Sequence, residues 1–145
     1  MKRDLEFEGG RAELLARLRL LKSNYDLRIE QLPDGLFDFF VTEEVSKVKF
    51  AVVVKLQRSF ESAMRKYISS INETTNNRML NCPVMVMKVD PEKEMGWVDL
   101  LAVPNENGVY QIRTKLEFLE LTSANIDKLI QRLIGYLDAK KILAS

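Results

Sequence analysis

The sequence predicts an α+β protein in which a mixed central sheet of about five to six strands is flanked by helices. Three observations support this class. Segments with helical spacing of apolar residues lie near both ends and in the middle, short alternating segments typical of strands lie between them, and two strands are apolar on both faces. The expected order is α-β-β-β-α-β-β-(β)-α. No repeat or internal boundary is evident, so residues 1–145 are interpreted as a single domain.

The first element is a helix from Arg11 to Lys22. Its apolar residues follow a spacing of i, i+1, i+4 and i+7, which predicts that they form one buried stripe of an amphipathic helix: Leu14, Leu15, Leu18 and Leu21. Gly9 and Gly10 precede this segment and are expected to loosen the chain before the helix begins.

Three strands are predicted next. Residues Tyr25 to Gln31 alternate between apolar and polar, which is typical of a half-buried strand, and a turn at 32–35 contains Pro-Asp-Gly. A second strand covers Leu36 to Thr42. A third covers Val48 to Gln57, and its run Phe50–Val54 is apolar on both faces, so this strand is expected to be central in the sheet.

The second half of the chain contains further strand and helix patterns. Pro83 and Asp90-Pro91 bound another strand that is apolar on both faces, and a loop containing Asn107-Gly108 predicts a hairpin. The predicted elements are a helix capped by Ser59 and running to about Asn72, a loop over 72–81, a strand over Val84–Val89, hairpin strands over Gly96–Val103 and Val109–Thr114, and a last helix capped by Thr122 or Ser123.

Composition excludes several kinds of chemistry. The chain has no histidine, which removes histidine acid–base catalysis and imidazole metal ligands, and its one cysteine, Cys82, cannot form an internal disulfide or a thiolate zinc site. The net charge of +1 means that a polyanion would have to bind a local basic patch. The start of the chain does not resemble a secretory signal, and no apolar run is long enough to span a bilayer, so we expect a soluble, cytoplasmic protein.

Two charged residues in apolar strands are the best candidates for a functional centre. Asp38 lies among large apolar residues of the second strand, and a buried carboxylate requires a cation, hydrogen-bond donors or a solvated cleft. Lys55 follows the apolar run of the third strand. A short connection makes the two strands neighbours, so these side chains can converge. A buried ion pair, or a lysine that reaches to the sheet edge, would explain the same residues without any chemistry.

Three segments carry a resemblance to a known superfamily. The first is residues 34–41 (DGLFDFFV), the second is residues 50–55 (FAVVVK), and the third is residues 83–90 (PVMVMKVD) followed by Gly96-Trp97-Val98. With their order and spacing, they make residues 8–103 resemble the restriction-endonuclease-like, or PD-(D/E)xK, nuclease superfamily, and more closely a bacterial defence-associated family on that fold. The resemblance implies a restriction-endonuclease-like domain that binds or processes nucleic acid.

The resemblance implies roles for particular residues. Asp38 would be the metal-binding aspartate, Lys55 the catalytic lysine, and Glu13 an additional metal-binding acid, with Mg²⁺ as the cofactor. The acidic position two residues before Lys55 is occupied by Val53, which offers no oxygen ligand. In an alternative alignment Gln57 takes the lysine position, but the second strand carboxylate is still missing. The resemblance therefore implies an incomplete, degenerate metal site and leaves activity open between a Mg²⁺-dependent nuclease and none.

Partner predictions follow from charge and amphipathicity. Arg58, Arg65 and Lys66 give the middle helix a basic face that could contact the phosphates of a nucleic acid, although such a face is also typical of a solvated surface. The rival interpretation is a non-catalytic, dimeric protein-interaction module. The element order also resembles that of the dimeric chaperones of bacterial secretion systems, and a regulator of a partner protein is a third interpretation. The amphipathic last helix either packs on the sheet or forms a homodimer.

Overall fold

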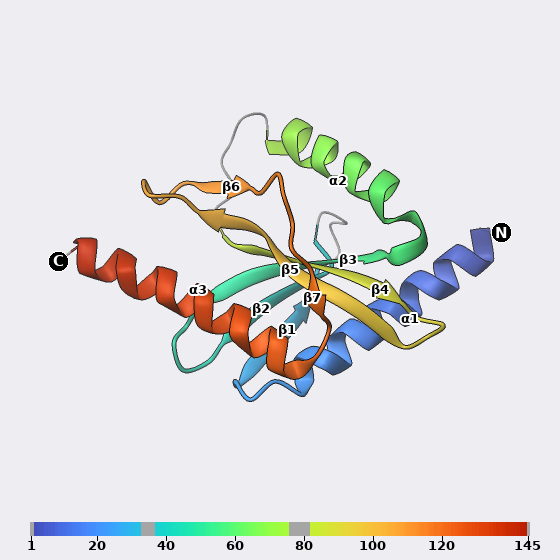
Figure 1. The fold of residues 1–145 in the computed structure, drawn as a ribbon, viewed down its shortest axis with the longest axis horizontal. Helices are drawn as coiled ribbons and strands as arrows, with labels where there is room; N and C mark the ends of the chain where they lie inside the picture. The colour runs from blue at the N-terminus through green and yellow to red at the C-terminus, as the bar shows by residue number, and fades with distance from the viewer. Residues whose placement is uncertain (1, 33–36, 76–81, 145) are drawn as a thin grey trace.

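The computed structural model describes residues 2–32, 37–75 and 82–144. Within those ranges the chain forms an α+β fold with one mixed sheet, so the predicted fold class is confirmed (Figure 1). In chain order, the elements are α1 (Lys2–Leu21), β1 (Leu27–Gln31), β2 (Phe39–Glu43), β3 (Lys49–Leu56), the 3-10 turn η1 (Gln57–Ser59), α2 (Phe60–Thr75), β4 (Val84–Asp90), β5 (Met95–Pro104), β6 (Tyr110–Ile112), β7 (Leu119–Glu120) and α3 (Ser123–Ala144).

The sheet follows the chain from one edge to the other, in the order β1-β2-β3-β4-β5-β6, and β7 also pairs with β5. Neighbouring strands run antiparallel except β3 and β4, which are parallel because α2 carries the chain back across the sheet between them. β3 is central, as predicted, and its residues 50–54 are all buried. The parallel register places Lys55 directly beside Lys88.

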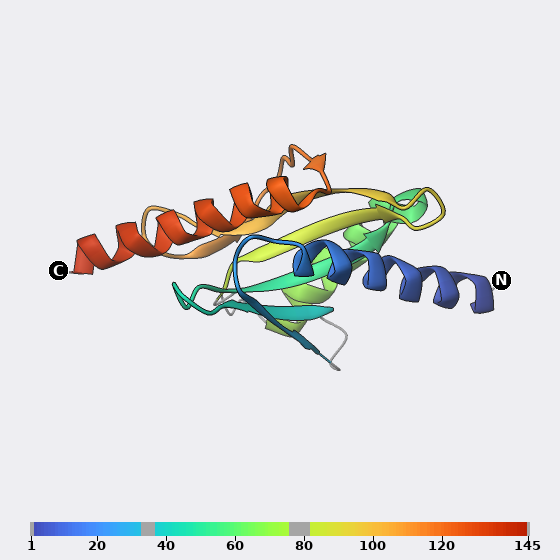
Figure 2. The ribbon, with the colours of Figure 1, turned by 90° about the horizontal axis from the view of Figure 1, so that it is seen from below.

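The two faces of the sheet are covered by different helices (Figure 2). One face packs against α1 and α3 and holds the larger core, in which Phe50, Met85 and Leu100 are completely buried. The other face packs against α2, and its smaller core includes Val53, Tyr67 and the partly buried Phe118. Strand alternation explains the division, because successive side chains of β3 point to opposite faces.

The prediction for the first helix was wrong in two respects. α1 begins at Lys2 and continues through Gly9 and Gly10, where an added Cβ would meet nothing within 4 Å. The residues of α1 that face the sheet are Ala12, Ala16 and Leu20, whereas three of the four predicted stripe residues are largely exposed: Leu14 at 59%, Leu18 at 47% and Leu21 at 59%. The two small alanines let the helix approach the sheet closely. The packing gained by this close approach decides which face of the helix is buried, against the face that the leucine spacing predicts.

Other boundaries differ less. β1 begins two residues later than predicted, at Leu27, and α2 continues to Thr75. β2 begins at Phe39, later than predicted, because Phe37 and Asp38 lie before the strand; the predicted turn at 33–35 and the predicted strand start at Leu36 lie outside the described residues. The hairpin of β5 and β6 is confirmed, and the short β7 is an addition. Across the described ranges, every helix is too short or too polar to cross a membrane.

Candidate functional site

Asp38 lies where the pairing of β2 with β3 ends. Its backbone N–H donates to the carbonyl oxygen of Val52 at 2.9 Å, one residue out of register with the ladder, in which Phe39 is the partner of Val52. Its carboxylate Oδ2 accepts a hydrogen bond of 2.7 Å from the backbone N–H of Val54, where a strand carbonyl would otherwise sit. The half-buried aspartate is therefore held in position by β3. Its other carboxylate oxygen can form a hydrogen bond with another side chain.

Glu13 reaches this aspartate from α1. The two carboxyl groups share a hydrogen bond, which requires that one of them carries a proton. Burial raises the pKa of Glu13 from 4.5 to about 7, the hydrogen bond to Asp38 and the negative charge of Asp38 add to this rise, and the positive charge of Lys55 opposes it. Near neutral pH Glu13 therefore changes between its protonated and its ionised form.

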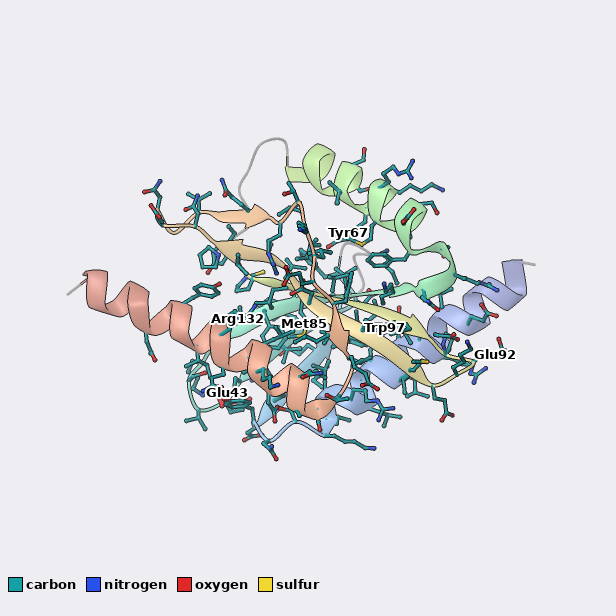
Figure 3. All side chains as sticks on the ribbon, viewed as in Figure 1. Glu43, Tyr67, Met85, Glu92, Trp97 and Arg132 are labelled. Atoms are coloured by element: carbon teal, nitrogen blue, oxygen red, sulfur yellow. The ribbon has the colours of Figure 1, made fainter. Side chains whose placement is uncertain are left out.

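Lys55 completes the group. It is half-buried near the end of β3, its charge acts on Glu13, and its Nζ lies 5.1 Å from the centroid of the Tyr67 ring on α2. Tyr67 is labelled in Figure 3 between α2 and the sheet. The chain thus brings together the three residues that the sequence singled out from three separate elements: Glu13, Asp38 and Lys55.

Val53 lies two residues before Lys55, at the position where the resemblance would place an acid. It is 1% exposed and packs in the core under α2. Within the ranges that the structure describes, no group of three or more acid, cysteine or histidine side chains is arranged to hold a metal ion. The site therefore offers two carboxylates, Glu13 and Asp38, as its strongest oxygen ligands.

Those two carboxylates suit a weak magnesium site. Mg²⁺ is commonly bound through one or two carboxylates and several waters, so this donor set fits the ion. One oxygen of Asp38 is already engaged by Val54, and Glu13 would have to lose its proton before it could bind. Both features lower the expected affinity.

A hollow of about 450 Å³ opens between the start of α2 and β4, and its wall includes Lys88, the register neighbour of Lys55. Its lining is mostly polar and basic: Gln57, Arg58, Ser59, Phe60, Glu61, Ser62, Arg65 and Lys88.

A second hollow of about 450 Å³ lies between α1 and the β4–β5 turn, and its lining also includes Gln57 and Arg58. Its wall contains Glu8, which forms an ion pair with Arg58 at 2.5 Å. Lys66 is exposed on α2. Gln57 and two of the three predicted basic residues, Arg58 and Arg65, therefore line the same hollow.

Lys88 is a site residue that the sequence reasoning missed. Its Nζ lies 4.5 Å from the centroid of Phe118 and 5.3 Å from those of Phe60 and Trp97, so three aromatic rings hold the ammonium group in place. Trp97 is labelled in Figure 3. The signal was present in the sequence, because Lys88 interrupts an apolar strand in the way that Lys55 does.

Asp99 on β5 is a buried carboxylate of a different kind. It is 3% exposed, and its oxygens accept hydrogen bonds from Nη1 of Arg113 at 3.0 Å and from the backbone N–H groups of Leu100 and Glu117, both at 2.7 Å. Its charge is compensated by a cation, and it fixes the segment that leads from β6 to β7. Asp99 is structural.

A scan against protein-family models and a search of curated proteins found no match for this chain. The arguments for function therefore rest on the site itself.

Proposed function

We propose that the chain is a nuclease-like domain that binds nucleic acid at the site of Glu13, Asp38 and Lys55, with a weakened capacity to hold Mg²⁺. The observation that carries this proposal is the convergence of two carboxylates and a lysine from α1, the start of β2 and the end of β3. The superfamily resemblance implies the same three residues. A bound Mg²⁺ would lower the pKa of a water ligand and offset charge on a phosphate.

The basic hollow supports nucleic acid as the ligand. Arg58, Arg65 and Lys88 line it, and the hydroxyl groups of Ser59 and Ser62 add hydrogen-bond donors suited to phosphate oxygens. Because Lys88 is paired in register with Lys55 on the adjacent strand, this basic surface begins one strand away from the lysine of the site. A phosphate backbone lying in the hollow would pass Lys88, the register neighbour of Lys55.

A cleavage assay tests the catalytic part of the proposal. With single- and double-stranded DNA and RNA, and with Mg²⁺ or Mn²⁺ titrated into the millimolar range, we expect slow cleavage that Asp38→Ala and Lys55→Ala abolish. Val53→Glu restores the missing acid on the face of Lys55 and is expected to raise the rate by about tenfold or more. Val53→Leu is the matched control, because it perturbs the same buried position without adding a ligand, and it should not raise the rate.

A binding assay tests the nucleic-acid part. Arg65→Ala and Lys88→Ala should each weaken binding of a fluorescent oligonucleotide about three- to tenfold at low salt and reduce the salt dependence of the binding constant. Lys128→Ala, an exposed lysine on α3, is the control and should leave binding unchanged. If the protein binds no nucleic acid at low salt, the proposed function is wrong.

The second candidate is a non-catalytic protein-interaction module, and one observation favours it. Leu14, Leu18 and Leu21 present about half of their surfaces to solvent along α1, which is unusual for three leucines on one helix. This candidate predicts no cleavage by the wild type or by Val53→Glu, and no nucleic-acid binding. The two assays above therefore separate the candidates.

A further inference from the structure

Among the described strands β1 pairs only with β2, so it forms an edge of the sheet with a defined hydrogen-bonding pattern. The backbone of Leu32 donates to Asp38, and Glu44 donates to the carbonyl of Asp26, so the even-numbered residues of this segment point their polar groups toward β2. The odd-numbered residues, Leu27, Ile29 and Gln31, consequently direct their N–H and C=O groups away from the sheet. Figure 2 shows β1 at the lower margin of the sheet.

β1 lacks the proline and the bulge that commonly prevent an edge strand from pairing. Its five residues are extended in one regular register with β2. Leu27 and Ile29 pack toward the core of the α1 and α3 face. Arg28 and Glu30 point to the opposite face with side-chain exposures of 58% and 55%.

The charges of β1 are complementary to those of a second β1. An antiparallel pair centred on Ile29 places Ile29 opposite Ile29 of the other copy, as a hydrogen-bonded pair, and brings Arg28 opposite Glu30 on each side of the two-fold axis. A pair centred on Arg28 would oppose two arginines, and a pair centred on Glu30 would oppose two glutamates. Of these three registers, charge favours the one in which all five residues of β1 are paired.

We infer that two copies of this chain associate through β1, in an antiparallel pair centred on Ile29 that joins their sheets into one. The interface is isologous, because the same strand serves both copies. The pairing satisfies the outward N–H and C=O groups of Leu27, Ile29 and Gln31 and forms two symmetric Arg28–Glu30 cross-strand pairs.

The dimer is expected to be of moderate affinity. Strand pairing alone buries less than the roughly 1,200 Å² typical of stable interfaces, so the expected Kd is micromolar. Additional apolar surface is available on α1, which packs against β1 and leaves Leu14, Leu18 and Leu21 largely exposed. Dimerisation should therefore be measured at protein concentrations of about 1–300 µM.

A charge-swap series tests the inferred register by sedimentation equilibrium. Arg28→Glu alone and Glu30→Arg alone each oppose like charges twice, and each should raise the Kd of the dimer by about tenfold or more. The double variant R28E/E30R restores opposite charges and should dimerise like the wild type. An equimolar mixture of the two single variants should form a heterodimer, because both glutamates on β1 of one chain then lie opposite arginines on β1 of the other.

Two controls separate association from folding. Each variant is checked by circular dichroism and thermal unfolding, because Arg28 also lies 3.4 Å from Glu30 and 3.7 Å from Glu44 within one chain. These exposed pairs contribute little to stability, so the variants should remain folded. Lys49→Glu reverses an exposed charge on β3, away from the edge, and should leave the Kd unchanged.

Cross-linking locates the two-fold axis. In a Cys82→Ser background, Ile29→Cys places two cysteines at adjacent positions and should give a disulfide-linked dimer under mild oxidation. Leu27→Cys places its cysteines more than about 10 Å apart and should not. A wild-type protein that is monomeric at about 300 µM, or a dimer whose Kd is unaffected by the single reversals, would overturn the inference.

Discussion

Asp99 and the Glu13–Asp38 pair show two opposite ways of holding a carboxylate against this sheet. Asp99 is compensated within the chain by a guanidinium group and two backbone N–H groups. Glu13 and Asp38 face each other instead, with one backbone donor on Asp38 and a lysine nearby, and the pKa of Glu13 rises as a result. A fully compensated carboxylate serves the fold, whereas two acids held together at an energetic cost fit the ligand-binding role proposed for this pair.

The largest expected effect is a loss of stability on substitution of Asp99. Asp99→Ala removes the acceptor of the Leu100 and Glu117 N–H groups and the carboxylate that pairs with Arg113, so the free energy of unfolding should fall by about 2–4 kcal/mol. At roughly 3 °C per kcal/mol, the melting temperature should fall by about 6–12 °C. Asp38→Asn is the comparison, because its amide oxygen still accepts the Val54 N–H, and its cost should stay below about 1 kcal/mol. Similar losses for both variants would contradict the distinction between the two acids.

A smaller effect is expected on the pH dependence of stability. The pKa of Glu13 is higher in the folded chain, at about 7, than its ordinary value of 4.5, so the folded state holds more protons between these values and stability falls as pH rises through this window. Glu13→Gln removes this contribution. We expect the variant to unfold about 2 °C above the wild type at about pH 8, and to show no gain at about pH 4.5. Glu92→Gln, an exposed acid in the β4–β5 turn, should produce no such pH-dependent gain.

The smallest effects are opposite shifts in the pKa of Glu13, measured by carbon-13 NMR of its side-chain carboxyl. Asp38→Asn removes a negative charge and should lower this pKa from about 7, although burial keeps it above 4.5. Lys55→Met removes a positive charge and should raise it. Shifts of the same sign would show that Glu13 is not coupled to both residues.

Much of the fold followed from periodicity. The two strands that are apolar on both faces, β3 and β4, became the buried centre of the sheet, because a strand covered by helices on both sides has no polar face. The proximity of Asp38 and Lys55 also followed, since a short connection makes β2 and β3 neighbours. The approach of Glu13 depended on how α1 crosses the sheet, which the sequence pattern did not determine.

The errors have physical causes. In α1 the leucines outnumber the alanines, and periodicity favours the larger side chains, but close packing on the sheet selected Ala12 and Ala16. Lys88 was overlooked because its significance depends on Phe60, Trp97 and Phe118, which lie on three different segments of the chain. An aromatic enclosure assembled from distant segments leaves no spacing signal.

The crossover through α2 has one more consequence. β3 and β4 are parallel, so both strands point in the same direction and deliver Lys55 and Lys88 to the same end of the sheet. If a tight hairpin replaced α2, β4 would be reversed, and Lys88 would lie beside Val52 instead of Lys55, about 10 Å along the strand. The location of this basic surface thus depends on the parallel direction of β3 and β4. A redesign that kept every residue of both strands but reversed β4 would remove the surface.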